Sequence, residues 1–102
     1  MNSSPADEDD LVDISDHLQS LDKTEIYQLG LVLGIAHHRL KEMKKQDLLE
    51  FRNDVIWKWL EQVDRVAKKG VPRWEGLSRA LEHSTIGQTG LAHTIRSSHG
   101  AP

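Results

Sequence analysis

The chain has 102 residues, with 13 basic and 16 acidic side chains and a formal net charge of −3. Its length fits one small domain, and the absence of cysteine excludes disulfide scaffolds, thiolate zinc sites and cysteine nucleophiles. No apolar stretch approaches the ~20 residues of a membrane-spanning helix. The acidic N-terminal sequence does not resemble a secretory signal, so we expect a cytoplasmic protein with no membrane insertion.

Charge is unevenly distributed along the chain. Residues 1–25 hold eight acidic side chains and one lysine, whereas residues 26–102 hold twelve basic and eight acidic ones. This asymmetry indicates partners of both signs, an acidic segment that folds back on the body, or a segment that only keeps the protein soluble. Residues 1–9 lack large apolar side chains after Met1, so we expect a disordered acidic tail. We expect residues 98–102 to be a frayed C-terminus.

The region between these ends, residues 10–97, is helical in pattern and has no alternation typical of a strand. A first helix is expected over residues 10–21, where apolar residues recur three or four positions apart. A second helix begins after Asp22 or Thr24, either of which can cap it, and ends at Gly34, which suits a left-handed C-cap.

Four further helices are expected after Gly34. The third covers residues 37–44. The fourth begins with Asn53 as its N-cap and continues until Gly70 stops it, and Pro72 suits a position at or near the first turn of the fifth. The apolar residues expected in the core of the last four helices are Leu40, Met43, Ile56, Trp59, Leu60, Val63, Val66, Ala67, Trp74, Leu77, Leu81, Leu91, Ala92 and Ile95. Six short helices joined by short connections predict an all-α fold, a six-helix antiparallel bundle.

Four segments resemble death domains. Residues 56–60 (IWKWL), 74–81 (WEGLSRAL) and 91–95 (LAHTI) are similar to the fourth, fifth and sixth helices of that family. Residues 27–35 (YQLGLVLGI) are similar to its second helix, although Tyr27 replaces the more usual tryptophan and Gly30 the usual alanine. We expect these two replacements to make the second helix less rigid.

The resemblance covers residues 11–95 and implies a bundle of the Greek-key death-fold type over residues 10–97. The last helix lacks the Arg-x-Asp-Leu motif of death-effector domains. We therefore favour the death domain proper over the death-effector and caspase-recruitment types.

The resemblance implies a non-catalytic adaptor or receptor module that binds other death-domain proteins in apoptotic or innate-immune signalling and allows weak self-association. In this family one surface joins the end of the fourth helix to the following loop, and another pairs the second and third helices with the first and fourth. The corresponding charged residues are Arg65, Lys68, Lys69 and Arg73 near the fourth helix, Arg39, Lys41, Lys44 and Lys45 near the third, and Asp10, Asp13 and Asp16 on the first. A single such lysine fits an ordinary solvated face, worth ~0–1 kcal/mol per ion pair. The cluster from Arg65 to Arg73 favours a contact surface.

The tryptophans differ in their expected exposure. Trp59 and Trp74 fall on the core stripes, so we expect both to be buried. Trp57 lies about 200° around the helix from Trp59, so we expect it to be partly exposed. It is either an anchor for a partner or a residue covered by a second side of the bundle.

Other chemistry finds little support in the sequence. Adjacent His37 and His38 point about 100° apart and the other four histidines lie on separate elements, so no metal site is expected. No phosphate-binding glycine loop or nucleophile elbow is present, so we expect no catalytic residue and no cofactor. Nucleic-acid binding through the basic patches is the second hypothesis. The net negative charge, the acidic first helix and the lack of exposed stacking aromatics make it the less favoured one.

Overall fold

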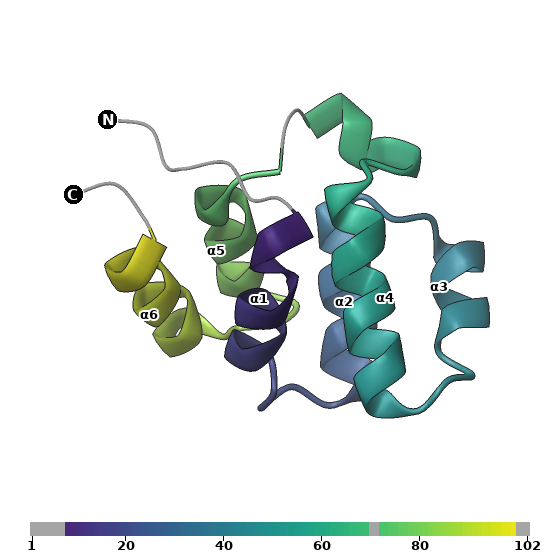
Figure 1. Cartoon of the computed structure of the whole chain (residues 1–102), viewed down its shortest axis with the longest axis horizontal. Coiled ribbons are helices and arrows are strands. Elements are labelled where there is room, and N and C mark those ends of the chain that lie inside the picture. The colour runs from purple at the N-terminus through teal and green to yellow at the C-terminus, as the bar shows by residue number, and fades with distance from the viewer. Residues whose placement is uncertain (1–7, 70–71, 100–102) are drawn as a thin grey trace.

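Six α-helices and two short 3-10 helices account for most of residues 8–69 and 72–99, which the computed structural model describes (Figure 1), and these residues form no strand. In chain order the elements are η1 (Glu8–Asp10), α1 (Leu11–His17), α2 (Lys23–Leu33), α3 (His37–Met43), α4 (Leu48–Leu60), η2 (Asp64–Lys69), α5 (Trp74–Glu82) and α6 (Thr89–His99). The all-α prediction is confirmed. The expected N-terminal tail lies mostly outside the described residues, as do residues 100–102 of the expected C-terminal one.

The start and end of α2 follow the sequence signals. Asp22 Oδ1 accepts a hydrogen bond from Glu25 N at 2.8 Å, and Glu25 Oε1 accepts one from Asp22 N at 3.2 Å, which together form a capping box. Gly34 ends the helix with a φ of +114°. Of the two expected caps, Asp22 is therefore correct, and Thr24 lies inside the helix.

Both predicted ends of α4 are wrong. The N-cap is Asp47, whose Oδ1 accepts a hydrogen bond from Glu50 N at 2.9 Å, and Asn53 lies within the helix. The helix ends at Leu60, well before Gly70, because Gln62 adopts a φ of +58°. The bonds Gln62 N to Trp59 O (3.0 Å) and Val63 N to Lys58 O (3.3 Å) form a Schellman cap around a residue other than glycine.

The remaining boundaries shift by a few residues. The first helix ends at His17 and not at residue 21, although Leu18 and Leu21 are still buried. Pro72 lies directly before the N-cap of α5, which is Arg73, and so near the first turn of that helix.

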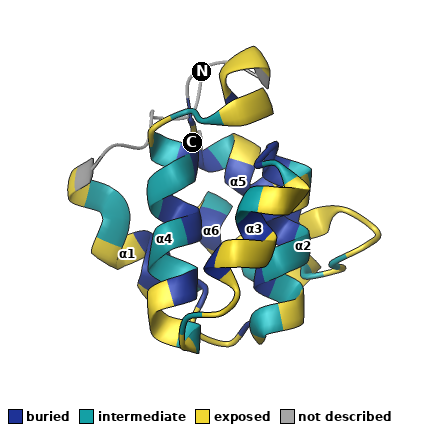
Figure 2. Cartoon of the chain, turned by 90° about the vertical axis from the view of Figure 1, so that its right-hand side faces the viewer, coloured by how far each residue is buried: buried dark blue, intermediate teal, exposed yellow. Residues whose placement is uncertain are grey.

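The core forms around α4, which contacts α1, α2 and α3, while α2 also packs on α5 and α5 on α6 (Figure 1). Figure 2 shows buried residues along the inner sides of the helices and exposed ones along the outer sides. Trp59 and Trp74 are 4% and 2% exposed, which confirms their predicted burial. Leu60, Val63 and Leu91 are only partly buried and pack at the edge of the core. Ala67 was expected in the core and is exposed, because α4 ends before it.

The two unusual residues of α2 both contact α3. A Cβ atom on Gly30 would lie 2.6 Å from Leu40 Cδ2, so the glycine allows α3 to approach α2 closely. The hydroxyl of Tyr27 shares a hydrogen bond with His37 Nδ1, and the two rings meet edge to face at a centroid distance of 5.5 Å. Both residues therefore attach α2 to its neighbour, and the lower rigidity of the helix stays a prediction.

Candidate interaction surfaces

An ion pair joins η2 to the start of α3. Arg39 Nε lies 2.8 Å and Nη2 3.3 Å from the two carboxylate oxygens of Asp64, and Ala36 N donates to Asp64 Oδ2 at 3.0 Å. The hydrogen bonds from Arg39 and from the Ala36 backbone lower the pKa of Asp64, and the same carboxylate raises the pKa of Arg39. Arg39, predicted from the sequence as a contact residue, is therefore compensated inside the fold.

Backbone contacts hold η2 against the turn between α2 and α3. Arg65 N donates to Gly34 O at 3.0 Å, and the Val66 side chain is only 2% exposed. A Cβ atom on Gly34 would lie 2.8 Å from Val66 N, so the close approach requires glycine. These contacts fix the backbone of η2, from which its cationic side chains extend.

Three cations on these neighbouring elements form what we call the basic surface: Lys41 on α3, and Arg65 and Lys68 on η2. All three are exposed, and their side chains have no ion-pair partner among residues 8–69 and 72–99. Because no carboxylate of the described chain forms an ion pair with them, they are available to an acidic partner.

The other basic residues predicted for these surfaces differ in their surroundings. Lys45 Nζ pairs with Glu42 Oε2 at 2.8 Å, and Lys44 Nζ lies 5.3 Å from the centroid of the Tyr27 ring. Arg73 is the N-cap of α5 and already has an interaction partner, so it is not counted among the unpaired cations. The side chain of Lys69 lies outside the described residues.

The acidic residues predicted on the first helix are not equivalent. Asp10 is the N-cap of α1 and is half-buried, and Asp13 Oδ1 lies 3.8 Å from His17 Nε2. Asp16 is exposed, and its carboxylate has no partner in the part of the chain that the structure describes. The carboxylate of Asp16 is therefore accessible to a cation of a partner.

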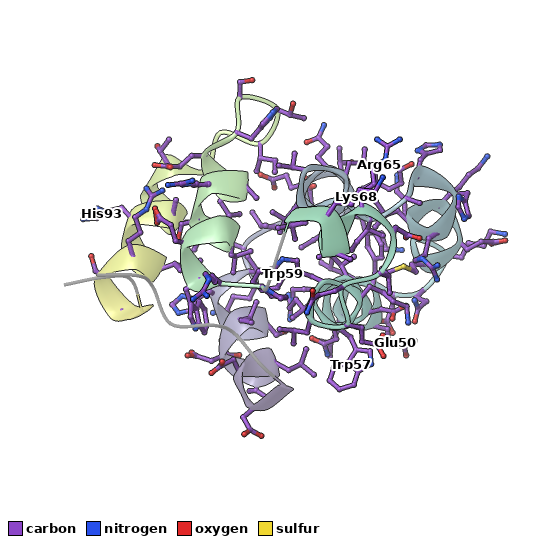
Figure 3. The ribbon with its side chains drawn as sticks, turned by 90° about the horizontal axis from the view of Figure 1, so that it is seen from above. Glu50, Trp57, Trp59, Arg65, Lys68 and His93 are labelled. Atoms are coloured by element: carbon purple, nitrogen blue, oxygen red, sulfur yellow. The ribbon has the colours of Figure 1, made fainter. Side chains whose placement is uncertain are left out.

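A second surface lies where α1 meets α4. Arg52 Nε donates to Ser15 Oγ at 3.0 Å and joins the two helices. Val12 on α1 is 70% exposed and Leu49 on α4 is 55% exposed. Trp57 is partly exposed, as predicted, and Figure 3 shows it with Glu50 on the opposite side of α4 from Arg65 and Lys68. Sequence reasoning missed Leu49 and Glu50 because it placed the start of α4 at Asn53.

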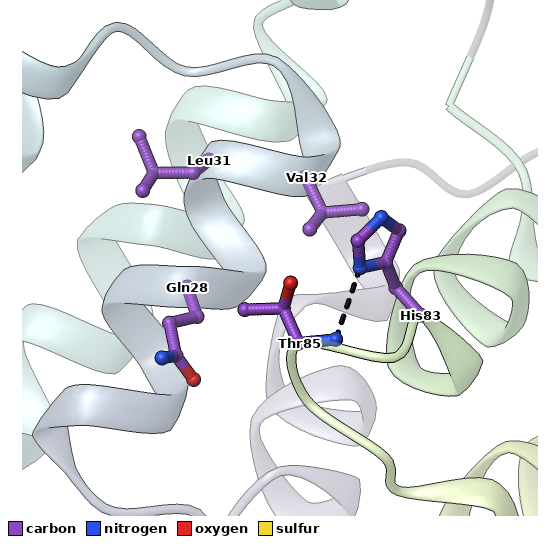
Figure 4. A pocket seen from close by; sticks show the side chains of 5 residues that line it. All are labelled: Gln28, Leu31, Val32, His83 and Thr85. Carbon is purple, nitrogen blue, oxygen red and sulfur yellow. Dashed lines mark hydrogen bonds between the residues drawn. The ribbon is translucent and has the colours of Figure 1, made fainter.

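A groove of about 390 Å³ lies between α2 and the α5–α6 loop (Figure 4). Its lining residues are Gln28, Leu31, Val32, His83 and Thr85. His83 Nδ1 accepts a hydrogen bond from Thr85 N at 3.2 Å, so the loop orients the imidazole. The groove thus brings two aliphatic side chains beside an amide, a hydroxyl and an imidazole.

No three His, Asp or Glu side chains of residues 8–69 and 72–99 lie close enough together to hold a metal ion. None of the described helices has the length and hydropathy needed to cross a bilayer. Comparison of the chain with protein-family models, curated proteins and solved structures found no match.

Proposed function

We propose that this chain is a non-catalytic protein–protein interaction module of the death-domain type. It binds other death-domain proteins through charged surfaces, in cytoplasmic complexes of apoptotic or innate-immune signalling.

The positions of the residues that resemble the family support this proposal. Trp59 in the segment 56–60 and Trp74 in the segment 74–81 are buried in the core, as are Leu81 and Ile95. Helices distant in sequence pack together, α1 on α4 and α2 on α5. Such packing is compatible with a Greek-key bundle and differs from a simple up-and-down order.

The observation that carries the proposal is the fixed and uncompensated charge of the basic surface. Arg65 and Lys68 extend from a segment that the Arg39–Asp64 pair and the Gly34–Arg65 backbone bond hold in place. Pre-organised backbone reduces the ordering cost of association, and unpaired cations give electrostatic complementarity to an acidic partner. This surface includes two of the four residues that the family resemblance assigned near the end of the fourth helix.

Affinity capture from lysate of the cells that express the chain tests the proposal. The unaltered domain is compared with an Arg65→Glu, Lys68→Glu variant and with Arg79→Glu, a control that reverses an exposed cation on α5. We expect the domain to recover proteins that carry small helical domains with acidic surfaces. The double variant should lose them and the control should keep them.

A parallel capture after nuclease treatment separates the two hypotheses. Retention of the same proteins supports a protein partner. Recovery limited to nucleic-acid-binding proteins that vanish with nuclease would replace the proposal with nucleic-acid binding.

A further inference from the structure

Exposed apolar side chains meet acidic ones across the junction of α1 and α4. We define the α1–α4 face by Val12 and Asp16 on α1 and by Leu49, Glu50 and Trp57 on α4. Among residues 8–69 and 72–99 the exposed large aliphatic side chains are Val12, Leu31 and Leu49. Two of these three, Val12 and Leu49, lie on this face, and they add to the apolar residues that α1 and α4 bury on their inner sides. Isolated exposed apolar residues need no explanation, but a cluster with an adjacent tryptophan is typical of a contact surface.

Helix geometry places the members of the face together. Ser15 bonds to Arg52 at the α1–α4 contact, and Val12 and Asp16 follow Ser15 around α1 by about 60° and 100° toward solvent. On α4, Leu49 lies about 60° and Trp57 about 140° around the helix from Arg52, and Glu50 lies two turns before Trp57. Val12 and Leu49 therefore lie nearest the junction, Trp57 lies farther out on the same side of α4, and each helix carries one carboxylate of the face.

The exposed charges of the face are acidic, whereas the half-buried cation at the contact, Arg52, donates to Ser15 Oγ. The carboxylates of Asp16 and Glu50 have no ion-pair or hydrogen-bond partner in the described parts of the chain. The nearby cation Lys58 lies 3.6 Å from Asp54 and 3.7 Å from Glu61, so it is already engaged by acidic residues. A partner for this face must therefore bring positive charge at its rim and apolar side chains at its centre.

We propose that the α1–α4 face binds a basic amphipathic helix of a partner protein, with Trp57 as its aromatic anchor on α4. Such a helix presents apolar residues three and four positions apart between flanking lysines or arginines, which matches a two-helix surface of this composition. A second copy of this chain is a poorer match. Its cations on α3 and η2 have no exposed large aliphatic residue beside them on those elements, because Leu40, Met43 and Val66 are buried.

This inference goes beyond the proposed function, because it uses the side of the molecule opposite to Arg65 and Lys68 (Figure 3). Failure of one leaves the other intact. The full chain is titrated at about 150 mM salt into a fluorescent amphipathic peptide of about 16 residues, made of leucine and lysine. A second peptide with glutamate in place of lysine serves as the charge control. Amide chemical shifts of the labelled chain locate the bound peptide.

We expect saturable binding of the lysine peptide only, with shifts concentrated on α1 and α4. Trp57→Ala and the Asp16→Lys, Glu50→Lys pair should each weaken binding by about tenfold or more. Leu49→Glu provides a surface variant if Trp57→Ala fails to fold. As controls, Leu31→Ala removes an exposed leucine elsewhere, and Glu42→Lys makes at another exposed acid the same charge change as either Asp16→Lys or Glu50→Lys alone; both should bind like the unaltered chain.

Three results would overturn the inference. The first is equal binding of the two peptides, and the second is binding that Trp57→Ala and Leu49→Glu leave unchanged. The third is self-association of the chain, detected by sedimentation, that the same two substitutions abolish, because the face would then serve a second copy.

Discussion

Arg39 and Asp64, 25 positions apart in the sequence, form a two-bond ion pair with an Nε–Oδ2 distance of 2.8 Å. The same carboxylate also accepts a hydrogen bond from Ala36 N. The carboxylate of Asp64 on η2 thus accepts hydrogen bonds from the backbone N–H of Ala36, the N-cap of α3, and from the guanidinium of Arg39 on that helix. The position of the cations on η2 depends on this contact.

The Arg39–Asp64 pair predicts a pH-dependent contribution to stability. In the folded protein the hydrogen bonds from Arg39 and Ala36 hold the pKa of Asp64 below its ordinary value of about 4. The pair therefore stabilises the fold fully above pH 4, and this stabilisation is lost as the pH falls through the lower pKa of the folded state. Asp64→Asn should therefore reduce the free energy of unfolding at pH 7 by about 1 kcal/mol, because the pair is partly exposed. Asparagine also tolerates the φ of +53° at this position, so backbone strain stays constant.

The measurement is urea unfolding of both proteins between pH 7 and pH 2. The difference in the free energy of unfolding between the unaltered chain and Asp64→Asn should shrink below pH 4 and vanish at the acidic end of this range. Asp16→Asn is the control, since its carboxylate has no partner in the described chain. A difference for Asp64→Asn that persisted unchanged at pH 2 would show that the ion pair does not cause it.

Gln62 predicts a stabilising substitution at the end of α4. Its φ of +58° is unfavourable for a residue with a Cβ atom, and glycine avoids that cost. Gln62→Gly should raise the free energy of unfolding by about 0.5–1 kcal/mol and raise Tm by several degrees. Glu61→Gly, one residue earlier at a φ of −76°, should lower Tm instead. If calorimetry finds that both substitutions lower Tm, the Schellman cap is not formed as described.

Two glycines predict opposite effects of the same change to alanine. At Gly34 a Cβ atom would meet the Val66 backbone at 2.8 Å and the φ is +114°, so Gly34→Ala should cost about 3 kcal/mol. At Gly76, inside α5, no atom lies within 4 Å of the added Cβ, so Gly76→Ala should gain about 0.5–1 kcal/mol from helix propensity. Chemical unfolding of the two variants measures both values. A mild cost at Gly34 would mean that η2 does not pack on the α2–α3 turn.

The fold was predictable wherever a local signal agreed with the packing. The stripe of α2, its Asp22 cap and its Gly34 end are all encoded within a few residues, and so is the burial of Trp59 and Trp74. The end of α4 was not, because Gln62 takes the left-handed conformation that sequence rules assign to glycine. Its start was missed because Asn53 and Asp47 are equally good caps by residue type, and a start at Asn53 leaves out Phe51, which is buried in the core.

The candidate surfaces were predictable only as lists of charged residues. The sequence placed Arg39 and Arg65 alike among the charged contact residues. In the structure, Arg39 forms an ion pair with Asp64, whereas the side chain of Arg65 forms none with the described residues. That outcome depends on η2 folding back on α3, which no local pattern encodes. The apolar part of the α1–α4 face was missed for a related reason, since Leu49 was expected in a loop.

The account's central claim is that the chain binds a protein partner through its basic surface. The most direct test is calorimetric titration, at about 150 mM salt, of a partner domain recovered by the capture experiment. The account predicts that Arg65→Glu, Lys68→Glu weakens binding by at least about tenfold and that Arg65→Glu alone weakens it by a smaller factor, while Arg79→Glu, which changes the charge as much as Arg65→Glu, has little effect. Equal weakening by Arg65→Glu and Arg79→Glu would reduce the effect to net charge, and unchanged binding by the double variant would contradict the claim.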